Sequence, residues 1–457
     1  MWTLRLSTAL PFLLAACTLD RAGLRDPGAG APVDASGPFD AASTDASGRV
    51  EDAALLDAPG SRCGDGVRQG AEACDGADLG EASCASEGFS RGVLGCTPEC
   101  RLDTVDCRNP PPNWHDTACP YRVALTVPPG LVTGAWSAFP LLVARTIPGL
   151  RDHALDGGTD LVFASQDGTQ RHPHEAERFD ADTGALAAWV ALPALEGSAG
   201  TTVYLYYGAE GCGASHPNDP TAVWDEHFRG VWHLAEAGVG ERRDSTRAAR
   251  AAAPAGYDGD EAVDGRIAGG DAMDGMNDHL VLPSAATRDL TTFTMCLWIR
   301  TGESRSNATA WRNPTLIGQI TTGYQSGDVG ILSEAGRVGL RSGLCAGADE
   351  LRVSGTTISD ATWHHVCAVG DGATVALHVD GTQVAQVCAG GRAVDPQAFW
   401  VGGQSGEAAG EAGAFHQGRF DEVQISDVAR APGWLQASHR NQRDPEAFVV
   451  VGPEETL

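Results

Sequence analysis

Apolar and polar residues alternate in short runs along most of the chain after residue 113. In Tyr121–Val127 the apolar Val123, Leu125 and Val127 recur at every second position, which is the period of a half-buried strand. An Asp380-Gly381 pair between two such runs is typical of a type I′ hairpin. The pattern therefore predicts an all-β fold whose other strand-like runs are Phe139–Ala144, Asp160–Phe163, Ala187–Leu192, Thr201–Gly208, Thr294–Ile299, Trp363–Val369, Val375–Val379 and Phe420–Ile425.

The N-terminus has a different pattern, an apolar run over Leu6–Ala16 that follows Arg5 and is too short to span a bilayer. Its end, Leu-Ala-Ala-Cys17, resembles the lipobox of bacterial lipoproteins, whose cysteine is acylated after cleavage. The resemblance implies a signal peptide at 1–17, lipidation at Cys17, and export to the outer membrane or cell surface, with the membrane as a partner. Thr18 weakly favours the outer membrane. An ordinary secretory signal cut nearby is the alternative.

Composition narrows the classes of function that are available. The formal charge of −28 repels phosphates, so nucleic acid is not an expected partner. The sequence contains no lysine, which removes Schiff-base and lysine general-base chemistry. Residues 18–62 contain almost no large apolar side chains, which predicts a disordered tether between the lipid and the folded modules.

Twelve cysteines follow Cys17, and they fall into three groups with an even number in each. In an oxidising compartment this predicts three separately cross-linked modules, whereas zinc is disfavoured because the first group lacks paired C-x-x-C motifs and has no histidine among its members. The pairing within a group cannot be deduced from the sequence. The disulfide candidates are Cys63, Cys74, Cys84, Cys96, Cys100 and Cys107, then Cys119 and Cys212, then Cys296, Cys345, Cys367 and Cys388.

The first group of cysteines lies in residues 63–108, which resemble the cysteine-rich repeat of myxobacterial surface proteins in both spacing and intervening residues. A module of this size depends on its cross-links for stability. Four acids among its glycines suggest either a calcium site or turn-forming side chains: Asp65, Glu72, Asp75 and Asp78.

Residues 113–225 resemble the family called domain of unknown function 2341. The resemblance is carried by a Tyr-Arg opening strand, then Thr-Asp-Leu-Val-Phe, Trp-Val-Ala-Leu-Pro and Val-Tyr-Leu-Tyr-Tyr-Gly. It implies a β-sandwich and no activity. The motif His172-Pro-His174-Glu175 could ligate zinc or copper, but a solvated loop explains it as well.

Residues 226–452 resemble the laminin-G-like, concanavalin A-like jelly roll, through Gly-Val-Trp-His-Leu, Trp-His-His-Val, His-Val-Asp-Gly and Phe-Asp-Glu-Val. Such domains often hold structural calcium, and the acids at comparable motif positions are Glu236, Asp244 and Asp421. Strand parity places Asp421 on the face of Val423 and Ile425, where a carboxylate needs either a cation or backbone amides. Both explanations of Asp421 stay open.

Glycoside hydrolases also use jelly rolls, but the Glu-x-Asp-x-Glu signature is absent, as are Gly-x-Ser-x-Gly and His-Glu-x-x-His. We therefore expect a binding or adhesion protein without catalysis, which recognises a glycan or a surface protein through the jelly roll. The aromatic candidates for ligand contact are Trp311 and Tyr324. A structural spacer without a ligand is the first alternative, and a carbohydrate-active enzyme is the second.

Overall fold

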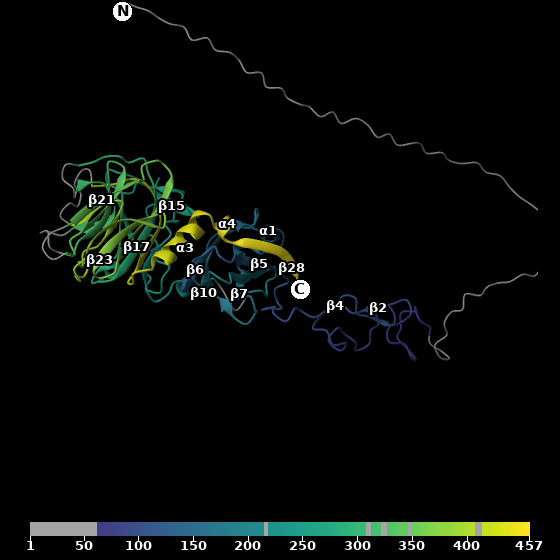
Figure 1. Ribbon diagram of the computed structural model, residues 1–457. Coiled ribbons are helices and arrows are strands. Elements are labelled where there is room, and N and C mark those ends of the chain that lie inside the picture. The colour runs from purple at the N-terminus through teal and green to yellow at the C-terminus, as the bar shows by residue number, and fades with distance from the viewer. Residues whose placement is uncertain (1–61, 214–217, 308–311, 321–326, 346–349, 407–413) are drawn as a thin grey trace, which may run out of the picture.

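The computed structural model describes residues 62–213, 218–307, 312–320, 327–345, 350–406 and 414–457. These residues form three β-rich modules arranged in a row (Figure 1). The all-β prediction is confirmed, with a β-sandwich, a jelly roll and a small disulfide-rich module in front of them. Cys17 and most of the 18–62 segment lie outside the described residues.

The cysteine-rich module has only two small antiparallel pairs of strands. Its buried side chains are mainly cysteines together with Leu94. The strands are β1 (Arg91–Gly92) with β4 (Cys107–Arg108), and β2 (Gly95–Cys96) with β3 (Leu102–Asp103).

The middle module is a sandwich of two antiparallel sheets. The smaller sheet has the order β6 (Ala135–Thr146), β10 (Ala185–Glu196), β9 (His174–Asp180). The larger sheet has the order β28 (Val450–Thr456), β5 (Tyr121–Val127), β11 (Thr201–Tyr207), β7 (Val162–Ser165), β8 (Arg171–His172). The short helix α1 (Pro148–His153) and two 3-10 turns, η1 (Asp156–Gly158) and η2 (Pro220–Ala222), lie in its connections.

The edge strand β28 comes from the other end of the chain, and this corrects the expected boundary of the jelly roll at residue 452. β28 pairs with β5 in the sandwich instead of completing the jelly roll. Side chains hold it there: Arg122 forms an ion pair of 2.6 Å with Glu455, and the Tyr207 hydroxyl donates to Glu454 at 2.6 Å. β28 and β5 are more than 300 positions apart in the sequence. Local periodicity indicates that a segment is a strand but not which distant strand it pairs with.

The jelly roll consists of two large sheets. One has the order β14 (Ala262–Asp264), β15 (Gly269–Asp274), β27 (Gln417–Ser426), β17 (Phe293–Arg300), β22 (Trp363–Gly370), β23 (Thr374–Val379), β24 (Thr382–Cys388), and β12 (Phe228–Trp232) also pairs with β27. The other has the order β13 (Ala253–Ala255), β16 (His279–Val281), β25 (Trp400–Val401), β18 (Thr315–Ile320), β19 (Val329–Glu334), β20 (Arg337–Ser342), β21 (Glu350–Thr357), and β26 (Ser405–Gly406) pairs with β18. The predicted hairpin is confirmed, since Asp380 and Gly381 both have positive φ, 50° and 75°.

A bulge in β27 overturns the predicted orientation of Asp421. Cys296 of β17 lies opposite Gln424 and Trp298 lies opposite Asp421, so β27 has one more residue than its partner here. Glu422 takes up the extra residue with a φ of 51°. Because cross-strand partners share a face, Asp421 lies on the outer face with Trp298 and not on the core face with Val423 and Ile425. Strand parity therefore does not carry from Val423 to Asp421, because the bulge interrupts the alternation between them.

That outer face packs against the sandwich. One continuous apolar cluster contains Leu142 and Trp189 of the sandwich, Cys296 and Cys367 of the jelly roll, and Trp434. Trp434 lies in α3 (Pro432–Arg443), which is followed by α4 (Pro445–Phe448) and lies where the two modules meet (Figure 1). The remaining helix, α2 (Ser284–Thr287), is a single turn. Within the described ranges, no helix combines the length and apolarity needed to cross a bilayer.

Candidate functional site

A groove of about 890 Å³ lies between the sandwich and the jelly roll, and we call it the inter-module groove. Its walls come from three parts of the chain: sandwich residues 171–173 and 191–193 with Ala138, linker residues 222–226, and jelly-roll residues 228, 229, 246–248, 250 and 427. Ligand sites are typically concave and commonly form where domains meet. The groove is therefore the candidate ligand site that the fold offers.

Four arginines line the groove, although the chain as a whole carries a charge of −28: Arg171, Arg229, Arg247 and Arg250. Arg247 donates through Nε to the carbonyl of Thr221 at 3.1 Å, and Arg250 donates through Nη1 to the carbonyl of Arg229 at 2.7 Å. A guanidinium has five N–H donors, so these contacts leave donors for a ligand. Three acids also line the groove, Asp225, Glu226 and Asp427, so arginines outnumber acids there although acids outnumber arginines in the whole chain.

Two of the three carboxylates of the groove form ion pairs. Asp225 accepts from Arg430 at 2.9 Å, and Asp427 contacts His227 at 3.0 Å and the groove residue Arg229 at 3.8 Å. Within the described part of the chain, the ion pairs do not include Arg247 or Arg250. Their charges are therefore available to an anionic ligand.

A second, smaller cavity of about 260 Å³ lies between the same two modules and is acidic. Glu175, Glu177 and His233 line this cavity, and Glu422 contacts His233 from behind the wall. Three carboxylates thus face one imidazole, and we call these four residues the His233 cluster: Glu175, Glu177, His233 and Glu422. Glu175 and Glu177 belong to β9 of the sandwich, Glu422 belongs to β27, and His233 directly follows β12. The cluster therefore joins both modules.

Hydrogen bonds orient the cluster on one side. Glu175 accepts from Trp224 Nε1 at 3.0 Å and from the Ser245 hydroxyl at 2.5 Å, and it lies 3.2 Å from His233 Nε2. Burial alone would raise the pKa of Glu175, but the contacts with His233, Ser245 and Trp224 together lower this pKa. Glu175 is thus a fixed carboxylate that holds the imidazole ring.

The other side of the cluster places two carboxylates on one nitrogen. Nδ1 of His233 is 2.7 Å from an oxygen of Glu177 and 2.7 Å from an oxygen of Glu422. Burial, with repulsion from Glu177, raises the pKa of Glu422 to about 8. Burial would lower the pKa of His233, but the three carboxylates raise it well above its ordinary value.

None of the three acids predicted from the laminin-G resemblance to bind calcium lies in the His233 cluster. Asp244 accepts from the backbone N–H groups of Val231, Thr246 and Arg250 and from the Thr246 hydroxyl. Asp421 accepts from the N–H groups of Arg266 and Ile267 at 2.6 and 2.8 Å. Glu236, on the wall of the acidic cavity, accepts from the N–H of Arg243 at 2.9 Å. All three acids thus accept backbone N–H groups, while Oδ1 of Asp421 is buried without a hydrogen bond from the described residues. In the described residues these three do not gather with other potential metal ligands, and calcium binding stays an expectation.

The acids of the cysteine-rich module also bind backbone amides. Asp75 accepts from the N–H groups of Gly64 and Asp65, and Asp78 from those of Arg68 and Gly80. Glu72 accepts from the N–H of Gln69, and Asp65 from that of Val67. This is the pattern that turn-forming side chains produce.

The His172-Pro-His174-Glu175 motif is divided between two environments. His172 lines the inter-module groove, whereas His174 packs against Phe163 with ring centroids 5.1 Å apart. Burial lowers the pKa of His174 to about 4. Only Glu175 reaches a cluster of potential ligands, and its histidine partner is His233. The sequence motif Gly-Val-Trp-His-Leu contained His233, but nothing local indicated that acids would surround it.

The twelve cysteines pair within their three groups, as predicted. The disulfides are Cys63–Cys100, Cys74–Cys96, Cys84–Cys107, Cys119–Cys212, Cys296–Cys367 and Cys345–Cys388.

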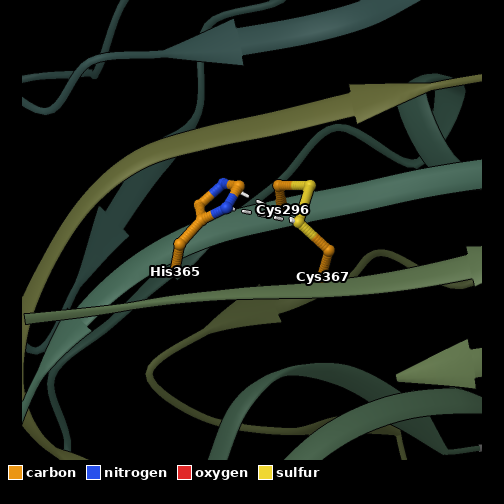
Figure 2. A group of neighbouring side chains, drawn as sticks. All are labelled: Cys296, His365 and Cys367. Carbon is orange, nitrogen blue, oxygen red and sulfur yellow. Dashed lines mark hydrogen bonds between the residues drawn. A yellow bond between two sulfur atoms is a disulfide. The ribbon is translucent and has the colours of Figure 1, made fainter. Parts of the chain in front are cut away.

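Figure 2 shows the buried ring of His365 facing the Cys296–Cys367 disulfide, with its ring nitrogens 3.7 and 3.8 Å from Cys367 Sγ. Burial lowers the pKa of His365 to about 3. Because the two sulfur atoms are bonded to each other, this group cross-links adjacent strands and offers no thiolate to a metal.

Trp311 and Tyr324, the predicted aromatic ligand contacts, lie outside the described residues. The aromatic residues that line the inter-module groove are Trp224 and Phe228, and both are buried. They pack in a T-shaped contact with ring centroids 5.1 Å apart.

Three solved structures illustrate the distant likenesses of this fold. Domain 4 of AbnA, a GH43 extracellular arabinanase from Geobacillus stearothermophilus in complex with arabinotriose, is 15% identical over 46% of this chain and 96% of that one, with a TM-score of 0.35. The binding domain of Paraclostridial Mosquitocidal Protein 1 is 15% identical over 46% and 52%, with a TM-score of 0.35. The receptor binding domain of botulinum neurotoxin C/D mosaic serotype is 10% identical over 48% and 52%, with a TM-score of 0.36. This chain thus spans about half the length of the two toxin domains, and likenesses this distant say nothing about ligand or activity.

A comparison with curated proteins finds no match. One protein family matches part of the sequence: residues 274–436 match the family described as the concanavalin A-like lectin/glucanases superfamily, of the laminin-G type. These residues run from the end of β15 into α3. The chain therefore carries a laminin-G-type concanavalin A-like domain across residues 274–436.

Proposed function

We propose that this protein is an exported, lipid-anchored binding protein that recognises an acidic glycan in the inter-module groove and does not catalyse a reaction. The observation that carries the proposal is the concentration of four arginines in a concave site of about 890 Å³ on a chain of net charge −28. Guanidinium groups bind carboxylates and sulfates through charge-assisted, often bidentate hydrogen bonds. A polysaccharide that carries uronate or sulfate groups fits this chemistry.

The remaining walls of the groove suit a sugar chain. Pro193 and Ala248 are exposed, and they present small apolar surfaces beside the arginines. Of the three carboxylates that line the groove, Asp225 and Asp427 form ion pairs and only Glu226 remains, so the groove does not present two free carboxylates of the kind that glycosidases place across a sugar bond. These features support binding over hydrolysis.

Lipid anchoring at Cys17 would hold the groove outside the cell, where acidic polysaccharides occur. The lipobox resemblance supports the anchor, and six disulfides among the described residues support an oxidising compartment.

A glycan array tests the proposal on the purified mature chain without its lipid. Arg247 is exposed, so Arg247→Glu should fold normally and weaken binding to uronate- or sulfate-bearing glycans by at least about tenfold, since a charge-assisted hydrogen bond contributes about 1.5–3 kcal/mol. Arg151→Glu is the matched control, because Arg151 is an exposed arginine of α1 and does not line the groove. Binding should weaken as salt increases.

Three results would contradict the proposal. Equal binding by the Arg247→Glu variant would place the glycan elsewhere. If the wild-type protein binds no glycan on the array, the alternative function as a structural spacer without a ligand is favoured. Release of reducing sugar from any polysaccharide would show that the protein is a carbohydrate-active enzyme.

A further inference from the structure

The His233 cluster has more buried negative charge than its single imidazole can neutralise. Three carboxylates approach the ring within 3.2 Å, and the side chains of Glu177, His233 and Glu422 are only 3%, 8% and 0% exposed. An imidazole supplies at most one positive charge, so the two sandwich carboxylates, Glu175 and Glu177, already exceed it, and buried carboxylates without a compensating cation are costly. Charge balance at the cluster therefore favours the binding of a cation.

The orientation of His233 is the one that a metal-binding histidine adopts. Its Nε2 faces Glu175, which is itself held by Trp224 and Ser245. A metal ligand commonly presents one ring nitrogen to the ion while the other donates to a carboxylate, which fixes the ring. Here Nδ1 is the nitrogen left to face Glu177 and Glu422.

Glu177 gives evidence for a bound cation that does not depend on the charge balance. Both of its carboxylate oxygens are buried, and within the described residues no hydrogen bond of acceptable geometry reaches either one. One of these oxygens nevertheless lies 2.7 Å from Nδ1 of His233. The same nitrogen forms its hydrogen bond with Glu422. A cation bound between the three groups would give this buried carboxylate the partner that its hydrogen bonds do not supply.

The distances are compatible with a metal ion after a small adjustment. The three potential ligand atoms lie within 4.8 Å of one another. Bonds of about 2.0–2.1 Å in a tetrahedral zinc site separate ligand atoms by about 3.3 Å, so each carboxylate would move by roughly 0.6 Å from its present 2.7 Å contact. The cavity of about 260 Å³ that Glu177 and His233 line gives an ion room to enter.

We propose that Glu177, His233 and Glu422 bind one divalent transition-metal ion, with Zn²⁺ as the best fit, and that this ion fastens the sandwich to the jelly roll. One imidazole nitrogen with carboxylate oxygens suits zinc, whereas calcium prefers oxygen ligands alone. Glu177 comes from the sandwich, and the other two ligands come from the jelly roll. Glu175 is a positioning residue, because it orients His233 and does not reach the ion.

Metal content and thermal stability of the full mature chain test the proposal, without any use of glycan. After treatment with EDTA and gel filtration, the wild-type protein should take up one Zn²⁺ per chain by elemental analysis, and Co²⁺ in its place should give d–d absorption bands. Free Zn²⁺ at about 100 times Kd should raise Tm by roughly 5 °C or more. Ca²⁺ and Mg²⁺ at the same concentration should leave Tm nearly unchanged.

Two cluster variants and one control locate the ion. Glu177→Gln should abolish stoichiometric uptake, and Glu175→Gln should weaken it by about 10- to 100-fold, as loss of a residue that supports a metal ligand does. Glu236→Gln is the matched control, because Glu236 lines the same cavity but lies outside the cluster. Near-ultraviolet circular dichroism of each metal-free variant checks its fold.

The inference is overturned if the wild-type chain retains no Zn²⁺ at equimolar concentration, or if folded Glu177→Gln binds Zn²⁺ as the wild type does. A preference for Ca²⁺ over Zn²⁺ would also overturn it. If Glu177→Gln does not fold, Glu175→Gln decides the matter through its reduced affinity. Failure of glycan binding would leave these measurements unaffected, so the two proposals fail separately.

Discussion

An ion pair inside the jelly roll allows the cost of an unpaired buried charge to be predicted. Arg242 and Asp271 are both fully buried, and the guanidinium donates to Asp271 through Nη2 at 2.7 Å and through Nε at 2.9 Å. Tyr257 donates its hydroxyl to the same carboxylate at 3.0 Å. Arg242 also donates Nη1 to the carbonyls of Gly238 and Gly240, so it cannot easily turn toward solvent.

Asp271→Asn removes the charge of the carboxylate and keeps its shape, which leaves a buried guanidinium without a counter-ion. Loss of one partner from a buried pair typically destabilises a protein by about 3–5 kcal/mol. For a domain of this size each kcal/mol lowers Tm by about 2–4 °C, so the expected decrease is roughly 6–20 °C. The double variant Arg242→Leu/Asp271→Leu should recover most of that loss, because it leaves no charge behind.

Differential scanning calorimetry of the whole chain measures this effect, with the transition assigned to the jelly roll by comparing variants. Asp152→Asn is the control: Asp152 forms a 2.8 Å ion pair with Arg151, but both side chains are about half exposed. Exposed pairs contribute little, so the control should melt like the wild type. If Asp271→Asn melts like the control, or if the double variant is as unstable as the single one, the reasoning about buried charge is refuted.

Two further predictions concern pH and localisation. The hydrogen bond with Asp380 raises the pKa of His364, so the pair should stabilise the fold fully below about pH 6.5 and lose this effect as pH rises through the raised pKa. The Tm difference between wild type and His364→Gln should therefore be larger near pH 6 than near pH 9, and a difference independent of pH would contradict this assignment. Cys17→Ala should release an intact, disulfide-bonded protein from the membrane fraction, as an immunoblot would show, and a variant that stays with the membrane would exclude the lipid anchor.

Strands with an uninterrupted local pattern could be predicted from the sequence. The run Tyr121–Val127 alternates without a break and coincides with β5, and Trp363–Val369 lies within β22. The hairpin at Asp380-Gly381 was also predictable, because positive φ at two successive positions needs particular residues. These features depend on neighbours in the sequence, which is why a single sequence reveals them.

The candidate sites depend on residues that lie far apart in the chain. Glu177, His233 and Glu422 are each an unremarkable residue on a separate element, and only the packing of β9 against β12 and β27 brings them to one point. The inter-module groove has the same origin, since its walls come from three separate parts of the chain. The sequence motifs therefore indicated Asp421, Glu236 and Glu175, but they did not indicate that Glu175 meets Glu177, His233 and Glu422.

The sequence by itself determined the all-β class, the order of the modules and the grouping of the cysteines, because each follows from local periodicity, composition or spacing. Tertiary structure decided which cysteine pairs with which, the return of β28 to the sandwich, and the outward direction of Asp421 after the bulge at Glu422. The physical reason is that strand pairing, bulges and buried charge clusters are chosen by contacts between distant segments. Those contacts stabilise the protein only when the segments meet in the folded state. The residues next to each segment in the sequence therefore do not reveal them.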